Sequence, residues 1–100
     1  MYHQTQKDTK MGTISYERSR IAEANPDAVL WDGLDEAIIG ITSNGKAVYD
    51  VKMLESIVWR NNKKHITSDE AKEWVEYNIL STYVGKNTPI HIWTINEEEE

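Results

Sequence analysis

The stretch Ala28–Ile41, AVLWDGLDEAIIGI, carries most of the information about the fold, because an acidic turn divides one apolar run into two short segments. Short apolar runs bounded by turn residues are typical of strands. We therefore predict a strand over Ala28–Trp31, a tight turn over Asp32–Glu36, and a second strand that follows the turn.

A hairpin signal comes next along the chain. The segments Glu36–Ser43 and Lys46–Asp50 are joined by Asn44-Gly45. This pair tolerates positive φ at both central positions of a type I′ turn, which is the turn that closes two-residue hairpins. The sequence therefore predicts two antiparallel strands.

The predicted turn also sets the register of the hairpin. With a two-residue loop, Ile41 lies opposite Val48, and Ile39 shares their face, so these three residues are expected to be buried. Gly40 and Tyr49 face each other on the opposite side, where the tyrosine ring would cover the bare glycine backbone.

Helices are predicted on both sides of the hairpin. Ser15–Ala24 has a short apolar stripe and is ended by Pro26. Asp50 can cap a helix that ends near Asn61-Asn62.

A second helix and a last strand complete the pattern. Thr67 and Glu70 form a capping box, and the helix is expected to run to about Tyr83, with Gly85 as its left-handed C-cap. Ile90–Ile95 then alternates as a strand, in which Ile90 and Ile92 share one face and His91 lies on the less buried face.

The predicted order is β-β-β-α-α-β, without alternating βαβ units. It indicates an α+β fold, a small two-layer sandwich in which two helices pack on an antiparallel or mixed sheet. We expect one domain over residues 13–96, a flexible N-terminal tail over residues 1–12 and an acidic C-terminal tail over residues 97–100.

Composition excludes several classes of function. The 100 residues include no cysteine, which excludes disulfides, thiolate catalysis and cysteine-ligated metals. No segment resembles a signal peptide or a membrane span, so we expect a cytoplasmic protein. Between Thr13 and Asn96 there are 12 acidic and 9 basic residues, a net charge of −3, which argues against direct binding of nucleic acid.

Catalytic patterns are not found in the sequence. It contains no G-x-S-x-G turn and no phosphate-binding glycine loop. His3, His65 and His91 fall in a tail, a loop and a strand, without the spacing of a zinc site. We therefore expect no enzymatic activity, no metal and no cofactor.

The acidic turn allows three interpretations. Asp32, Asp35 and Glu36 are best explained as a solvated turn, although they could also contact a basic protein or hold a hard divalent cation through their oxygens. Trp59 stands beside the basic cluster Arg60–His65, which is better explained by the dipole of a helix C-terminus than by base stacking.

Asn78 lies in the apolar stripe of the second helix, so we expect a buried amide that bonds a neighbouring loop or contacts a ligand. Trp31 and Trp74 are assigned to the core, whereas other aromatic residues are candidates for an interface. The candidate binding residues are Asp32, Asp35, Glu36, Tyr49, Trp59, Tyr77, Asn78, Tyr83, Lys86, Thr88 and Trp93.

Four segments together resemble a group of small uncharacterised bacteriophage-encoded proteins. They are DGLDEAIIG (Asp32–Gly40), AVYD (Ala47–Asp50), EWVEYNIL (Glu73–Leu80) and YVGKNTPI (Tyr83–Ile90). The resemblance covers about two thirds of the chain. It implies no activity, but it implies a setting: a phage accessory protein in the bacterial cytoplasm that binds a host protein such as a defence nuclease or RNA polymerase.

Two functional hypotheses follow. The first is a non-enzymatic phage accessory protein that occupies or inhibits a host protein, such as a nucleic-acid or defence enzyme, through acidic and aromatic surface. The alternative is a small-ligand or nucleotide site formed where the turns Asp32–Glu36 and Tyr83–Thr88 approach each other, with Asn78 beneath. A homo-oligomer is compatible with either, because a small domain gains stability by association.

Overall fold

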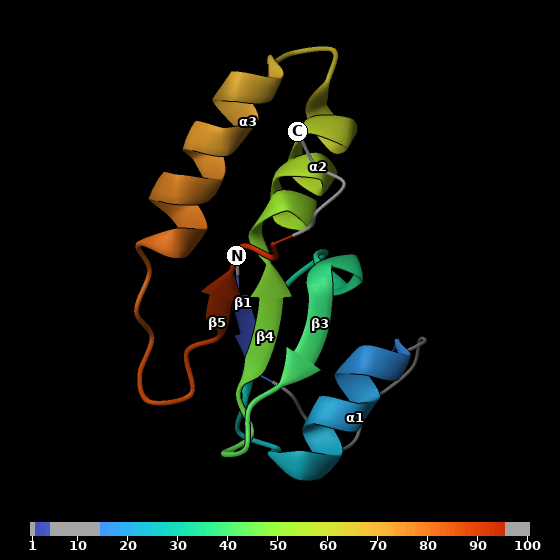
Figure 1. Ribbon diagram of the computed structural model, residues 1–100, viewed down its shortest axis with the longest axis vertical. Helices are drawn as coiled ribbons and strands as arrows, with labels where there is room; N and C mark the ends of the chain where they lie inside the picture. Colours follow the sequence, from blue (N-terminus) through green and yellow to red (C-terminus); the bar gives the residue numbers. More distant parts are fainter. Residues whose placement is uncertain (1, 5–14, 96–100) are drawn as a thin grey trace.

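A mixed three-stranded sheet and two helices form the body of the molecule (Figure 1). The computed structural model describes residues 2–4 and 15–95. Strands β3 (Ile38–Ile41) and β4 (Ala47–Asp50) are antiparallel, and β5 (Ile90–Ile92) is parallel to β4. Helices α2 (Val51–Asn62) and α3 (Ser68–Val75) pack against this sheet. The predicted α+β class is confirmed.

The predicted strand after Ala28 exists, but it belongs to a second sheet. This strand, β2 (Val29–Trp31), pairs antiparallel with β1 (Tyr2–Gln4), in a segment where the sequence indicates no strand. Backbone pairing with a distant segment of the chain leaves no local signal in such a short run. Of the N-terminal tail predicted over residues 1–12, residues 2–4 form β1 and the others lie outside the described residues, as does the tail predicted over residues 97–100.

Helix α1 (Tyr16–Ala24) confirms the predicted N-terminal helix. The Ser15 side chain accepts the Arg18 N–H as N-cap, and Asn25, the residue before Pro26, is the C-cap. Its buried residue is Ile21. A single turn of 3-10 helix, η1 (Asp35–Ala37), then leads from the acidic turn into β3.

The hairpin is confirmed, whereas its predicted turn is wrong. The Thr42 N–H bonds the Lys46 carbonyl, and the Gly45 N–H bonds the Thr42 carbonyl, so three residues rather than two form the loop. The φ of Gly45 is +91°, but the φ of Asn44 is not positive. A type I′ turn needs positive φ at both central residues, so this turn type is excluded. This arrangement matches the common three-residue loop with a left-handed glycine.

The longer loop shifts the register, and a shift of one residue exchanges the two faces of a strand. Gly40 lies opposite Val48, Ile38 lies opposite Tyr49, and a bulge separates the two pairs. Tyr49 is fully buried and does not cover Gly40, whereas Ile39 is 50% exposed. The predicted buried face, which included Ile39, is therefore wrong.

The same inversion affects β5. His91 lies opposite Tyr49 on the buried side of the sheet, while Ile90 and Ile92 are exposed. The prediction that His91 lies on the less buried face is also wrong. Apolar residues on both faces of these strands leave the pattern of alternation ambiguous.

Both predicted caps of the long helices are confirmed. The Asp50 carboxylate accepts the Met53 N–H at the start of α2, and Thr67 and Glu70 form the capping box of α3. After Val75, α3 continues as a π-helical turn, η2 (Glu76–Leu80), which ends earlier than the predicted Tyr83.

Gly85 does not act as the helix C-cap that the sequence predicts. It has a φ of +108°, and its carbonyl accepts the Thr88 N–H in a separate turn before β5. The helix has already ended at Ser81, which is the C-cap of η2.

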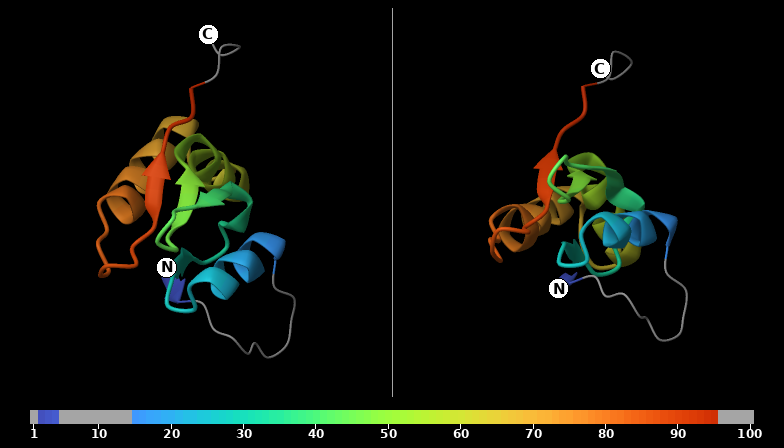
Figure 2. Two further views of the ribbon diagram at one scale, coloured as in Figure 1. Left: turned by 60° about the horizontal axis from the view of Figure 1, so that its bottom comes forward. Right: turned by 90° about the horizontal axis from the view of Figure 1, so that it is seen from below.

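The core lies between the two sheets and the helices. In the left view of Figure 2, α2 and α3 lie side by side behind β4 and β5, and α1 lies near β3. Trp31 is fully buried as predicted, but Trp74 is 37% exposed, so its assignment to the core is wrong. The largest fully buried side chains are Trp31, Tyr49, Leu30, Leu54, Ile57, Ile79, Val51 and Val75.

None of the helices within the described ranges combines the length and the apolar character that crossing a membrane requires.

Candidate functional site

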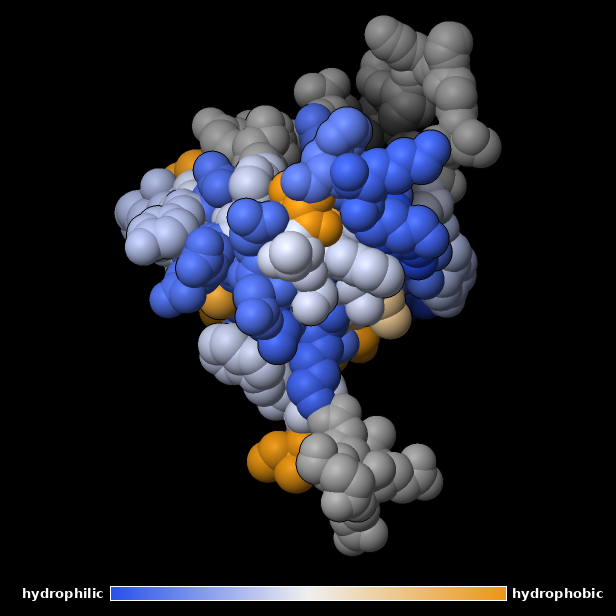
Figure 3. Space-filling model, turned by 90° about the horizontal axis from the view of Figure 1, so that it is seen from above, coloured by the Kyte–Doolittle hydropathy of each residue, from blue (hydrophilic) through white to orange (hydrophobic). Residues whose placement is uncertain are grey.

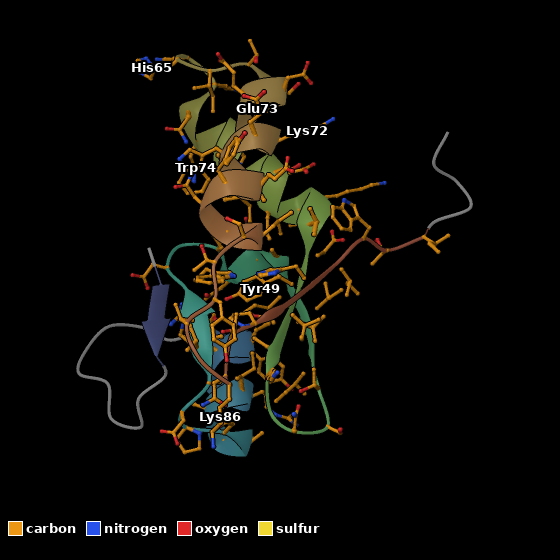
Figure 4. All side chains as sticks on the ribbon, turned by 90° about the vertical axis from the view of Figure 1, so that its left-hand side faces the viewer. Tyr49, His65, Lys72, Glu73, Trp74 and Lys86 are labelled. Carbon is orange, nitrogen blue, oxygen red and sulfur yellow. The ribbon has the colours of Figure 1, made fainter. Side chains whose placement is uncertain are left out.

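The outer side of α3 and η2 combines carboxylates with two exposed aromatic rings. We call this surface the acidic helix face and define it by Asp69, Glu73, Trp74, Glu76 and Tyr77. Residues three or four apart on a helix are neighbours on its surface, so the five side chains form one continuous strip. Figure 4 shows Glu73 and Trp74 on the outer side of α3.

A shallow hollow of about 350 Å³ opens beside this strip. It is lined by Ile66, Glu70, Glu73, Trp74, Tyr77 and Asn78. Trp74 is 37% exposed and Tyr77 is 76% exposed. Apolar rings next to carboxylates suit a lysine or arginine side chain, because its methylene stem can pack on a ring while its charged end meets a carboxylate.

The acidic helix face carries the carboxylates of Asp69, Glu73 and Glu76. Within the part of the chain that the structure describes, Asp69, Glu73 and Glu76 take part in no ion pair. Lys72 is the one basic residue of α3. The surface can therefore attract a cationic partner.

Asn78 is exposed, so the prediction of a buried amide is wrong. Its side-chain nitrogen donates to the Trp74 carbonyl at 2.9 Å. In the same way, Ser81 Oγ donates to the Tyr77 carbonyl at 2.8 Å and Thr82 Oγ1 to the Asn78 carbonyl at 3.0 Å. These donors satisfy carbonyls of the π-helical turn and the end of the helix, which explains the polar residues there.

The acidic turn connects elements of the fold. Asp35 accepts two hydrogen bonds from the Arg18 guanidinium, at 2.8 and 3.0 Å, and one from Ser15 Oγ at 2.7 Å. The hydrogen bond to Asp35 raises the pKa of Arg18. Glu36 pairs with Arg60 at 2.6 Å, and Asp32 is exposed. Two of the three carboxylates thus join α1 and α2 to the start of β3.

The two predicted turns adjoin the two ends of the short strand β2. At one end, the Val29 N–H bonds the Asn87 carbonyl at 3.4 Å, and the acidic turn follows Trp31 at the other end. Thr88 makes hydrogen bonds within its own turn, where its Oγ1 accepts the Val84 N–H at 2.9 Å and donates to the Gly85 carbonyl. The small-ligand site between the turns stays a prediction.

Three rings meet between the sheets. The Trp31 backbone N–H donates to Tyr49 Oη at 2.8 Å, and Trp31 Nε1 donates to His91 Nε2 at 2.9 Å. The planes of the Trp31 and His91 rings differ by 13°, and their centroids are 5.8 Å apart. Burial raises the pKa of Tyr49, and desolvation lowers the pKa of His91. Tyr49 is a packing residue, so its assignment to a binding surface is corrected.

Two residues of the basic cluster Arg60–His65, at the C-terminal end of α2, contact other side chains of the protein. Lys63 Nζ lies 5.8 Å from the centre of the Trp59 ring, and Arg60 pairs with Glu36. Figure 3 views this end of the molecule and shows mainly hydrophilic residues. Two other predicted aromatic residues, Tyr83 and Trp93, are 77% and 60% exposed.

The outward side of the three-stranded sheet is a second surface, which sequence reasoning missed. We call it the outer sheet face and define it by Val48, Ile90 and Ile92, which share one side of the β4–β5 pair. Ile90 and Ile92 are each 37% exposed. Adjacent β-branched residues that remain exposed on a sheet mark a potential protein contact.

Comparisons with protein-family models, with curated proteins and with solved structures return no match for this chain.

Proposed function

We propose that this protein is a non-enzymatic phage accessory protein that occupies a host protein in the bacterial cytoplasm. The observation that supports this proposal is the acidic helix face, where carboxylates flank the exposed rings of Trp74 and Tyr77. The partner is expected to present a basic surface, as the nucleic-acid-binding site of an enzyme does. Occupying that surface would block its normal substrate.

The rings and the carboxylates of the acidic helix face are expected to contribute differently to binding. The rings of Trp74 and Tyr77 supply apolar contact area, which is where binding energy concentrates in interfaces. The carboxylates of Glu73 and Glu76 lie on an exposed helix, so they chiefly raise the association rate and make it depend on salt.

The test is capture of a partner from bacterial lysate with the full chain and two matched variants. Glu73→Gln/Glu76→Gln removes two charges from the acidic helix face, and Glu17→Gln/Glu23→Gln removes two from α1. We expect one stoichiometric host protein to be retained by the wild type and by the α1 variant, and to be lost from the α3 variant. Its association rate should fall with ionic strength, and cross-links should join α3 to basic residues of the partner.

Equal capture by all three proteins, or an association rate that ignores salt, would contradict the proposal. Circular dichroism of each variant checks that the fold is retained, because all four glutamates are exposed.

A second copy of this chain is a further partner that we propose, at a different surface. The outer sheet face supports it, because β-branched residues exposed on a small sheet gain stability when another copy covers them. This contact would leave the acidic helix face free for the host protein.

A further inference from the structure

A polar hollow of about 490 Å³ lies where three distant segments of the chain meet. The C-terminal end of α1, the β3–β4 loop and the turn before β5 all contribute to it, and they meet at the lower end of the molecule in Figure 1. Its polar lining residues are Asn25, Asp27, Asn44, Lys46, Lys86 and Asn87. Figure 4 places Lys86 at this end, remote from Lys72 on α3.

The floor of the hollow is held in place by Asn25. Its side-chain nitrogen donates to the Gly45 carbonyl at 3.1 Å and to Asn87 Oδ1 at 3.0 Å, and its Oδ1 accepts the Asp27 N–H at 3.0 Å. Gly45 must lack a side chain here, because a Cβ would lie 2.7 Å from Asn25 Cβ. The three segments are therefore fixed before any ligand arrives, which lowers the entropic cost of binding.

Hydrogen-bond donors dominate the open part of the lining. The amide oxygens of Asn44 and Asn87 accept from Thr42 Oγ1 and Asn25 Nδ2, and no hydrogen bond from either NH₂ group is found among the described residues, so both groups can donate to a ligand. Over the described ranges, the ammonium groups of Lys46 and Lys86 make no ion pair. Two cations and two amide donors are suited to the oxygens of an anion.

We propose that this hollow binds a small phosphorylated compound, with the phosphate on Lys46 and Lys86. The hollow has room for more than a phosphate ion, and the Asp27 carboxylate in its lining can accept a hydrogen bond from a hydroxyl group of the same ligand. Asp27 and the chain's net charge of −6 repel an extended nucleic-acid backbone, which favours a compact ligand such as a sugar phosphate.

The test is titration of the full chain with inorganic phosphate, ribose 5-phosphate and a short single-stranded DNA, with chloride at equal ionic strength as the baseline. The side-chain amide signals of Asn44 and Asn87 in ¹⁵N-resolved spectra report binding at the hollow. Lys46→Gln/Lys86→Gln removes both cations, and the matched control Lys64→Gln/Lys72→Gln removes two exposed lysines outside the hollow.

We expect ribose 5-phosphate to shift both amide signals in a saturable way and to bind more tightly than inorganic phosphate. The Lys46/Lys86 variant should bind at least tenfold more weakly, while the control should bind as the wild type does. Three results would each overturn the proposal: shifts that only follow ionic strength, equal binding by the two variants, or saturation by DNA without saturation by ribose 5-phosphate. Ribose 5-phosphate that binds no more tightly than inorganic phosphate would also overturn the claim of a phosphorylated organic ligand.

Discussion

The two faces of the β3–β4–β5 sheet differ: rings with polar atoms are buried on one face, and isoleucines are exposed on the other, which is the reverse of the order that hydropathy predicts. The buried face carries Tyr49 and His91 against Trp31, while the outer sheet face exposes Ile90 and Ile92 of β5. Tyr49 Oη accepts the Trp31 backbone N–H and His91 Nε2 accepts the Trp31 indole N–H, so burying these polar atoms carries little penalty. The buried face is thus specified by paired polar groups, and the outer face retains apolar surface for a contact.

The largest expected difference between the faces concerns tryptophan. Trp31→Ala should reduce the free energy of unfolding by about 3–5 kcal/mol, because it removes a fully buried ring and leaves a cavity. Trp93→Ala is the matched control, since that ring is 60% exposed, and should change it by less than about 0.5 kcal/mol. Chemical denaturation of both variants measures the difference, and equal losses would refute the contrast.

A smaller effect is expected when a single hydroxyl is removed from the buried face. Tyr49→Phe removes the hydroxyl oxygen that accepts the Trp31 N–H and should cost about 1–3 kcal/mol. Tyr83→Phe removes a hydroxyl from a ring that is 77% exposed and should leave the midpoint of urea unfolding unchanged. If Tyr49→Phe were equally harmless, the hydrogen bond would not specify the buried face.

Acid should weaken the buried face through His91. Its pKa is lowered in the folded protein by desolvation, and its Nε2 accepts the Trp31 indole hydrogen bond in the neutral form. Stability from the neutral ring is present above the unfolded pKa of about 6.5 and is lost as the pH falls from there through the lowered folded pKa.

Thermal unfolding between about pH 7.5 and pH 5, a range that spans the unfolded histidine pKa of about 6.5, measures this dependence of stability on pH. His91→Gln should flatten the curve, whereas His65→Gln, at an exposed loop position, should leave it as in the wild type. A wild-type curve that is flat over this range would show that His91 is protonated without cost.

The smallest effect on stability is expected at the outer sheet face. Ile90→Thr/Ile92→Thr keeps β-branched side chains, and both positions are partly exposed, so the monomer should lose less than about 1 kcal/mol. Sedimentation equilibrium should nevertheless show weaker self-association than in the wild type. A wild-type protein that stays monomeric at high concentration would leave this face without the partner that we propose for it.

Local signals in the sequence identified most elements. Asp50 as N-cap, the capping box of Thr67 and Glu70, and the helix stop before Pro26 act within one turn of the chain, so they are readable without the tertiary structure. The predicted α+β class followed from these elements, and it is confirmed.

The candidate surfaces were only partly predictable. Tyr77 was named as an interface residue from its type, but Trp74 was assigned to the core, because its helix position alone does not show which side faces the sheet. Asn78 illustrates the same limit. Asn78 lies in the π-helical turn η2, and its side chain bonds the Trp74 carbonyl, four residues earlier in α3. The periodicity of an α-helix does not reveal this geometry.

The sequence by itself determined the order of the helices and strands that follow β1 and the presence of a hairpin, because caps, prolines and glycines act on neighbouring backbone. The tertiary structure alone decided the faces of the sheet, the pairing of β2 with β1, and the meeting of Asn25 with Gly45 and Asn87. Each of these depends on contacts between distant residues. One extra residue in the β3–β4 loop is enough to reverse a face, since side chains on a strand alternate with a period of two.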